Sequence, residues 1–278
     1  MKKNKNSLFL GMAAFLFLAV PSCTDKIDDP GKREKEPAEQ QPSGRQEEPA
    51  EEESVVDDGV FTTYTWEGFS FKIRSAEVGY SSAKKAMDLL KKNLTEINAL
   101  LPDFALEVMH KNPIWMEKNL TDGAAWYHTS IEWLAAEGYM TEKWHCVELC
   151  NYVHYVSWTN QNQPYMILHE LCHLFHDQYL PGGFDNPDVL AAYNHAMNEG
   201  LYVNTAYRLD DHTLIEHYDD YYHAKVYATT NCMEYFSEIC EAYWGENDYY
   251  PFNYDDLKAY DVQGFALMEK VWGPREDK

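Results

Sequence analysis

The sequence predicts an α+β domain, in which a small sheet is followed by helices, and two observations carry this prediction. Aromatic and apolar residues alternate with polar ones between Phe61 and Ile73, which is the pattern of a strand or hairpin. From Pro164 onwards, apolar residues recur at helical spacing in three separate stretches. Strands come first and helices follow them, and this order is typical of an α+β layout.

The first half of the domain contains the expected strands. After the strand or hairpin at residues 61–73, Ser82 is expected to cap a helix whose apolar stripe ends before Pro102, because proline cannot continue a helix. The elements that follow are expected to be short: strands over residues 106–109 and 114–116, a helical turn over 131–136, and one strand or a pair of strands over 146–158.

The second half is expected to be helical. Pro164 begins a helix that ends near Tyr179, before a Pro-Gly-Gly sequence. A second helix is expected over residues 188–200, and a third over residues 231–243, where a glycine soon follows. Between them, residues 209–223 are polar, acidic and rich in tyrosine and histidine, which predicts a loop.

The amino terminus has the pattern of a targeting segment. Three lysines precede an apolar stretch over residues 8–20, which is too short for a comfortable membrane span. The next residues, Val20-Pro21-Ser22-Cys23, resemble a bacterial lipoprotein processing site. We expect residues 1–22 to be removed as a signal peptide and Cys23 to carry a lipid. The lipid would anchor the protein at the outer membrane or cell surface of a Gram-negative bacterium. An ordinary signal peptide or an uncleaved anchor is the alternative.

Residues 23–58 are expected to form a disordered tether. Residues 24–58 contain four prolines, no aromatic residue, and 13 acidic against 5 basic residues. Such a composition cannot bury a core and stays extended. Residues 59–278 are rich in tyrosine and tryptophan and long enough to bury a sizeable core, so we expect them to form a single domain.

The formal net charge of −23 restricts the partners. A chain this acidic is not expected to bind nucleic acid or an anionic membrane surface, so any membrane contact is expected through the lipid alone. A protein or peptide substrate is compatible with the charge, and the oligomeric state is not readable from the sequence. No CxxC pair occurs among the six cysteines, which disfavours a cysteine-based zinc site.

The strongest motif in the chain is His169-Glu170-Leu171-Cys172-His173, an HExxH sequence in an apolar helical stretch. Two histidines four residues apart lie on one helix face, so both imidazoles can reach one metal ion. Glu170 lies about 100° round the helix, where its carboxylate can contact a metal-bound water. The motif therefore indicates a hydrolytic zinc site with Glu170 as the general base. The alternative is a core helix whose two histidines are satisfied by other contacts.

A catalytic zinc usually has three protein ligands and one open position, so a third ligand is needed. The metzincin pattern does not supply it, because His176 and Tyr179 stand where that pattern requires glycine and histidine. His176 lies about 10 Å along the helix from His169 and is too far away to share its ion. It is expected to be a neighbouring polar residue or a cap.

Glu234 and Glu238 are the better candidates. They lie four residues apart on the third predicted helix, so one can bind zinc while the other accepts the free N–H of a ligand histidine. We expect Glu234 to be the ligand and Glu238 to be the partner. The alternative is that Asn231 and Glu234, which have capping-box spacing, only begin a helix.

The two motifs together resemble the gluzincin metallopeptidases of the anthrax lethal-factor type. The resemblance lies in HExxH followed by Tyr227-x-x-Thr230-Asn231-x-x-Glu234-Tyr235-Phe236-Ser237-Glu238. A looser likeness to uncharacterised bacterial secreted proteins runs from about residue 104 to the end. The resemblance implies a zincin-like fold with a small mixed sheet, and the following roles: zinc ligands His169, His173 and Glu234, general base Glu170, ligand partner Glu238, and transition-state donor Tyr227. Without the resemblance, Tyr227 would be one core aromatic among 21 tyrosines.

The expected function is therefore that of a surface-anchored, zinc-dependent peptidase. The alternative is a zinc-containing lipoprotein without turnover that binds glycan or peptide through an aromatic groove, since 15% of the residues are aromatic. Glu170 favours catalysis, because binding needs no base. A purely structural zinc is disfavoured, because such sites normally fill four protein positions. Residues 146–158 are further expected to offer an edge strand to an extended peptide.

Overall fold

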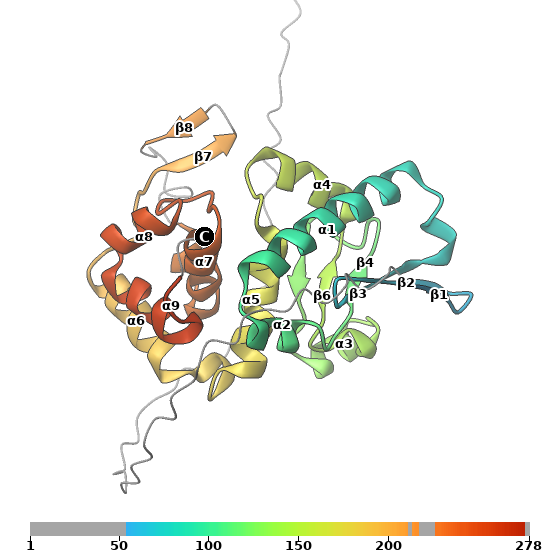
Figure 1. The fold of residues 1–278 in the computed structure, drawn as a ribbon, viewed down its shortest axis with the longest axis horizontal. Helices are drawn as coiled ribbons and strands as arrows, with labels where there is room; N and C mark the ends of the chain where they lie inside the picture. Colours follow the sequence, from blue (N-terminus) through green and yellow to red (C-terminus); the bar gives the residue numbers. More distant parts are fainter. Residues whose placement is uncertain (1–53, 211–212, 217–225, 276–278) are drawn as a thin grey trace, which may run out of the picture.

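The computed structural model describes residues 54–210, 213–216 and 226–275. In these ranges the chain has a mixed α+β structure with nine α-helices, a six-stranded sheet and a two-stranded sheet (Figure 1). The α+β prediction is thus confirmed. The expected signal peptide, Cys23 and the tether up to residue 53 lie outside the described residues. None of the helices in the described part combines the length and hydrophobicity needed to cross a bilayer.

The six-stranded sheet is small and mixed. Its strands are β1 (Ser54–Asp57), β2 (Phe61–Trp66), β3 (Phe69–Arg74), β4 (Ile114–Met116), β5 (Trp126–Tyr127) and β6 (Val147–Leu149). They run in the order β1-β2-β3-β4-β6-β5. The first three strands are antiparallel, β3, β4 and β6 are parallel, and β5 pairs with β6 in the antiparallel sense. The predicted hairpin at residues 61–73 is therefore β2 and β3.

The first strand differs from the expectation for the tether. Residues up to 58 were expected to be disordered, whereas Ser54–Asp57 pair with Thr62–Thr65 of β2. All four β1 residues are exposed, so backbone pairing holds this strand rather than burial of apolar surface. A composition poor in apolar residues predicts that a segment cannot bury a core. It does not exclude an exposed edge strand, which backbone pairing can hold in place.

Two segments expected as strands are helical. Residues 106–109 belong to helix α2 (Asp103–Met109). Residues 146–158 contain only the three-residue strand β6, after which helix α4 (Tyr152–Gln161) begins. The Asn151 side chain accepts hydrogen bonds from the backbone N–H groups of Val153 and His154, and this cap starts α4 despite its β-branched and aromatic residues.

One hydrophobic core lies between the sheet and the helices. Along β3, Phe69, Phe71 and Ile73 alternate inward and are almost fully buried. Helix α1 (Ser81–Leu100) contributes the predicted apolar stripe, although Ser82 lies within the helix and is not its N-cap. Helix α5 (Met166–Tyr179) packs against α1, α2, β5 and β6, so the predicted HExxH helix is central to the core.

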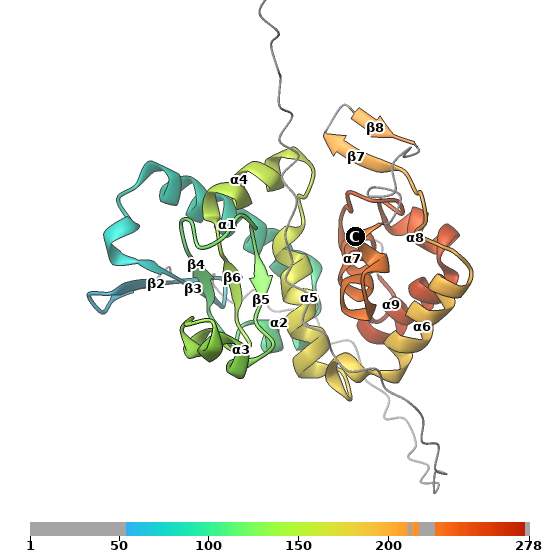
Figure 2. The same cartoon turned by 180° about the vertical axis from the view of Figure 1, so that it is seen from behind.

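The C-terminal half is a helical layer on the other side of α5 (Figure 2). It contains α6 (Pro187–Asn198), α7 (Cys232–Trp244), α8 (Tyr254–Tyr260) and α9 (Val262–Trp272). The first two were predicted, and the last two were not. Part of the expected loop at 209–223 belongs to a hairpin of β7 (Tyr207–Asp210) and β8 (Thr213–Ile215), and residues 211–212 and 217–223 lie outside the described residues.

Helices α5 and α7 run antiparallel along each other. Tyr165, just before α5, faces Gly245 at the end of α7, whereas His176 near the end of α5 contacts Phe236 near the start of α7. A Cβ atom at Gly245 would lie 2.2 Å from the Tyr165 ring, so only glycine allows this close approach. The pairing brings the HExxH face of α5 opposite the glutamates of α7.

Candidate metal centre

Helix α5 places both HExxH histidines on its α7 side. Every residue from Met166 to His176 is buried, as expected for a helix covered on two faces. The rings of His169 and His173 lie 4.8 Å apart, centroid to centroid. Both side chains are about nine-tenths buried. The spacing of four residues therefore gives the two imidazoles a common target.

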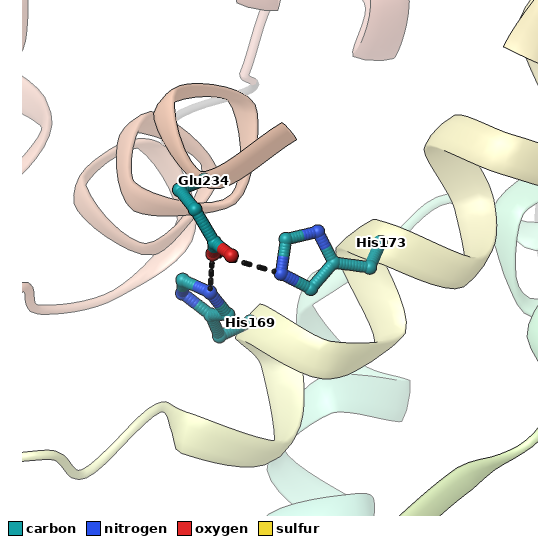
Figure 3. Close-up of side chains that lie close together, drawn as sticks. All are labelled: His169, His173 and Glu234. Atoms are coloured by element: carbon teal, nitrogen blue, oxygen red, sulfur yellow. Dashed lines mark hydrogen bonds and ion pairs between the residues drawn. The ribbon is translucent and has the colours of Figure 1, made fainter. Parts of the chain in front are cut away.

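The carboxylate that both imidazoles face belongs to helix α7. Asn231 caps the helix by accepting hydrogen bonds from the N–H groups of Met233 and Glu234, each at 2.9 Å. The Glu234 side chain is left for another role: its Oε2 lies 3.0 Å from Nε2 of His169 and 3.0 Å from Nε2 of His173 (Figure 3). Asn231 is therefore a cap, as its spacing allows, but Glu234 is more than a helix-starting residue.

The three side chains could hold a metal ion. Their donor atoms, two imidazole nitrogens and one carboxylate oxygen, lie within 4.8 Å of one another. Burial alone would raise the pKa of Glu234, but His173 and His169 lower it well below its usual value. Burial alone would lower the pKa of His169, but Glu234 and Glu241 raise this pKa well above its usual value. The site thus favours positive charge beside the carboxylate, and its donor set is one that zinc accepts.

The far nitrogens of the two imidazoles have different partners. His169 Nδ1 lies 2.7 Å from Oε1 of Glu241, and His173 Nδ1 lies 3.1 Å from Oγ of Ser237. The expected partner Glu238 is 3.9 Å from His169 Nδ1, beyond hydrogen-bond distance, and accepts instead from Asn247 at 3.1 Å. The assignment of Glu238 as the hydrogen-bond partner of a ligand histidine is therefore corrected to Glu241.

Glu170 is buried next to the two ligand histidines. Burial raises the pKa of its carboxyl, and the neighbouring imidazoles of His173 and His169 lower it in part. Glu170 directly follows His169 on α5, so its Cβ lies about 100° round the helix from that of His169, and its role as general base stays a prediction.

Tyr227 lies in a short 3-10 turn, Tyr227–Thr229, just before α7. Its ring centroid is 6.0 Å from that of His169. Burial, together with the nearby Glu234 carboxylate, raises the pKa of Tyr227 well above its usual value, so its hydroxyl remains protonated. Tyr227 therefore lies beside the candidate ligands, and its role as a transition-state donor stays a prediction.

His176 does not belong to the metal centre. Its imidazole packs between Phe184 and Phe236, with ring centroids 5.1 and 4.7 Å away. Burial, with a smaller contribution from His173, lowers its pKa to about 3, and neither nitrogen has a hydrogen-bond partner within the described part of the chain. It is a neutral core side chain, and the capping role is not observed.

The expected edge strand is also different. Residues 147–149 form β6, which lies between β4 and β5, so its backbone is already paired on both sides. The open edge next to α5 is β5, whose two residues, Trp126 and Tyr127, are half-buried. Residues 146–158 therefore cannot accept an extended peptide as an added strand.

The cysteines take no part in the centre. Cys172, within HExxH, is fully buried near Cys240 of α7, which is fully buried as well. All five described cysteines are free thiols. The expectation that Cys172 fills core space agrees with this position.

One contact of the centre, that of Glu241, is missing from the sequence-based prediction, although helical spacing allows it. Glu241 lies seven residues after Glu234, whereas the predicted partner Glu238 lies four residues after it. Seven residues are almost two complete turns, so Glu241 also returns to the face of Glu234.

Comparison of the chain with protein-family models, curated proteins and solved structures found no match, so the evidence for the candidate site is its own geometry.

Proposed function

We propose that this protein is a zinc-dependent peptidase. The observation that supports the proposal is the convergence of His169, His173 and Glu234 on one point, with Glu170 buried beside them. Three protein ligands leave one coordination position for water or substrate, as in hydrolytic zinc enzymes. The fold is consistent with a zincin-like arrangement, in which one helix supplies two histidines and another supplies a glutamate.

Bound zinc would supply Lewis-acid polarisation of a water molecule and of the scissile carbonyl. Glu170 would accept the proton of the attacking water and then pass it to the leaving amine. Tyr227 would donate its hydroxyl hydrogen to the oxyanion that forms on the carbonyl.

The substrate class is a protein or peptide, and the location is the cell surface. Both parts of the proposal come from the sequence: the acidic chain disfavours nucleic acid, and Val20-Pro21-Ser22-Cys23 resembles a lipoprotein processing site. Cys23→Ser should release the protein from the membrane fraction if the lipid is its only anchor. A Cys23→Ser protein that stayed in the membrane fraction would refute the lipid anchor.

The decisive test separates zinc binding from hydrolysis. We expect wild-type protein to bind one zinc ion and to cleave members of a broad peptide library. Glu170→Gln should keep the zinc and lose activity by about 10²- to 10⁴-fold, since it removes the base but no ligand. His173→Ala should lose both. Wild-type protein that binds zinc without cleaving any peptide would refute the peptidase and favour the binding lipoprotein.

A further inference from the structure

The hydrogen bonds behind the two ligand histidines are unequal. His169 Nδ1 faces a carboxylate, that of Glu241 at 2.7 Å, whereas His173 Nδ1 faces the neutral hydroxyl of Ser237 at 3.1 Å. Both partners come from α7, the helix that also carries Glu234. The structure therefore places a charged partner behind one imidazole only.

We propose that Glu241 is the positioning residue of the metal centre, and that it acts through His169. This inference rests on the proposed function, because it requires that His169 binds a metal. An imidazole with its Nδ1–H bonded to a carboxylate has its lone pair on Nε2, the nitrogen that faces Glu234 and His173. The negative charge of Glu241 also strengthens Nε2 as a donor.

The helical geometry explains why Glu241 takes this position. Relative to Glu234, a residue seven positions later lies about 20° away round the helix axis and about 10 Å along it. A residue four positions later, such as Glu238, lies about 40° away on the other side. The imidazole of His169 fits between Glu234 and Glu241, with one ring nitrogen directed at each carboxylate.

Glu238 has a different set of contacts. Its Oε1 lies 3.9 Å from His169 Nδ1, and its Oε2 accepts a hydrogen bond from Nδ2 of Asn247 at 3.1 Å. Asn247 lies in the loop that follows α7 and is itself buried. Glu238 therefore ties this loop to the helix, and it is a matched control, because both glutamates are buried on α7 near His169.

Glu241→Gln and Glu238→Gln of the full chain test the proposal, because each keeps the side-chain shape and replaces a carboxyl group by an amide. Zinc affinity would be measured by competition with a chromophoric chelator. We expect Glu241→Gln to weaken zinc binding by about 10- to 100-fold, and Glu238→Gln to change it by less than about 3-fold. Thermal unfolding of the metal-free proteins would separate loss of affinity from loss of fold.

A second measurement applies even if Glu241→Gln fails to fold. In ¹⁵N-labelled, zinc-loaded protein, the His169 Nδ1 resonance should show a bound proton, and Glu238→Gln should leave it unshifted. A shift in Glu238→Gln, or a loss of affinity there as large as in Glu241→Gln, would overturn the assignment. So would a Glu241→Gln protein with wild-type affinity.

These outcomes are distinct from failure of the peptidase proposal. Zinc binding with the expected ranking but without peptide cleavage would remove the activity and keep the role of Glu241. Peptide cleavage by the wild type, together with a larger loss of zinc affinity in Glu238→Gln than in Glu241→Gln, would keep the activity and remove the role of Glu241. Wild-type protein without zinc affinity would remove both.

Discussion

Two buried polar clusters in this protein differ in how their charge is balanced. The sheet cluster consists of Glu117, His128, Lys143 and Glu148. In it, Lys143 Nζ contacts both carboxylates, at 3.0 Å for Glu117, and His128 lies 2.7 Å from Glu148. Arg74 adds a second cation at 3.0 Å from Glu117. The chain thus supplies its own cations here.

The helix-pair cluster consists of His169, Glu170, His173, Glu234, Glu238, Glu241 and Asp248. Among the described residues, no lysine or arginine forms an ion pair with its carboxylates; only the two imidazoles do. Burial and the neighbouring Glu241 raise the pKa of Asp248 to about 7, a sign of surplus negative charge. The comparison teaches that the sheet cluster is complete, whereas the helix-pair cluster is suited to an added cation.

The largest expected effect would follow from removing the sheet cluster's own cation. Lys143→Met would leave two buried carboxylates without their amine, and we expect a loss of about 3–5 kcal/mol in the free energy of unfolding. Urea unfolding would measure it. Lys270→Ala breaks the ion pair with Asp188, in which both side chains are about half exposed, and should lose less than about 1 kcal/mol. Equal losses of stability in the two variants would contradict the conclusion that Lys143 balances the buried charge of the sheet cluster.

A smaller effect, on rate alone, is expected from a neutral group beside the helix-pair cluster. Tyr227→Phe should lower the rate of peptide hydrolysis by about 10²-fold or more while zinc affinity stays the same, because the hydroxyl acts on the oxyanion and not on the metal. Tyr193→Phe is the control, since its hydroxyl donates to the Thr229 carbonyl. Full turnover by Tyr227→Phe would return Tyr227 to a core role.

The packing of α5 on α7 should matter only to the helix-pair cluster. Gly245→Ala would force the Tyr165 ring away from α7, and we expect about 1–3 kcal/mol of destabilisation together with weaker zinc binding. Gly79→Ala is the control, because no atom lies within 4 Å of its Cβ position, so its effect should stay within about 0.5 kcal/mol. Thermal unfolding and chelator competition would check both. Unchanged zinc affinity in Gly245→Ala would show that the centre tolerates a shift of the helices.

The smallest effect concerns pH. Burial alone would raise the pKa of Glu148, but His128 and Lys143 bring it below its usual value. Such a carboxyl stabilises the fold above its unfolded pKa of about 4.3, and this contribution is lost as the pH falls through the folded value. The stability difference between wild type and Lys143→Met should therefore shrink as the pH falls from about 4.3 through the lower folded value of Glu148. Urea unfolding across this range would show it, and a constant difference would exclude Glu148 as the cause.

The sequence predicted those elements whose signals are local. The alternation in residues 61–73 and the apolar periods of α1, α5 and α7 all gave the correct element. Helix α4 was missed because its tyrosine, valine and tryptophan residues favour strands, and the cap at Asn151 together with burial of Tyr152 and Tyr155 overrides that preference. Helix α9 begins at Val262 and is capped by Asp261, whose side chain accepts a hydrogen bond from Gly264 N–H, although the sequence alone did not lead us to expect this helix.

The candidate ligands were predictable because helical periodicity fixes them in two short segments. The partners of the ligands were not, since they depend on how α5 and α7 are aligned. Glu238 and Glu241 are equally plausible from α7 alone. Only the packing of the two helices, including the close approach of Tyr165 and Gly245, determines that His169 meets Glu241.

Because α5 and α7 pack directly against each other, the geometry of the candidate centre does not depend on the segment that joins the two helices. His169 and Glu234 are 65 positions apart, yet their geometry is set by the packed helices at both ends of that segment. Doubling the length of such a connection raises its closure entropy by only about 0.6 kcal/mol. Insertions there can therefore change the length of this connection while the candidate donor atoms of His169 and Glu234 keep their positions.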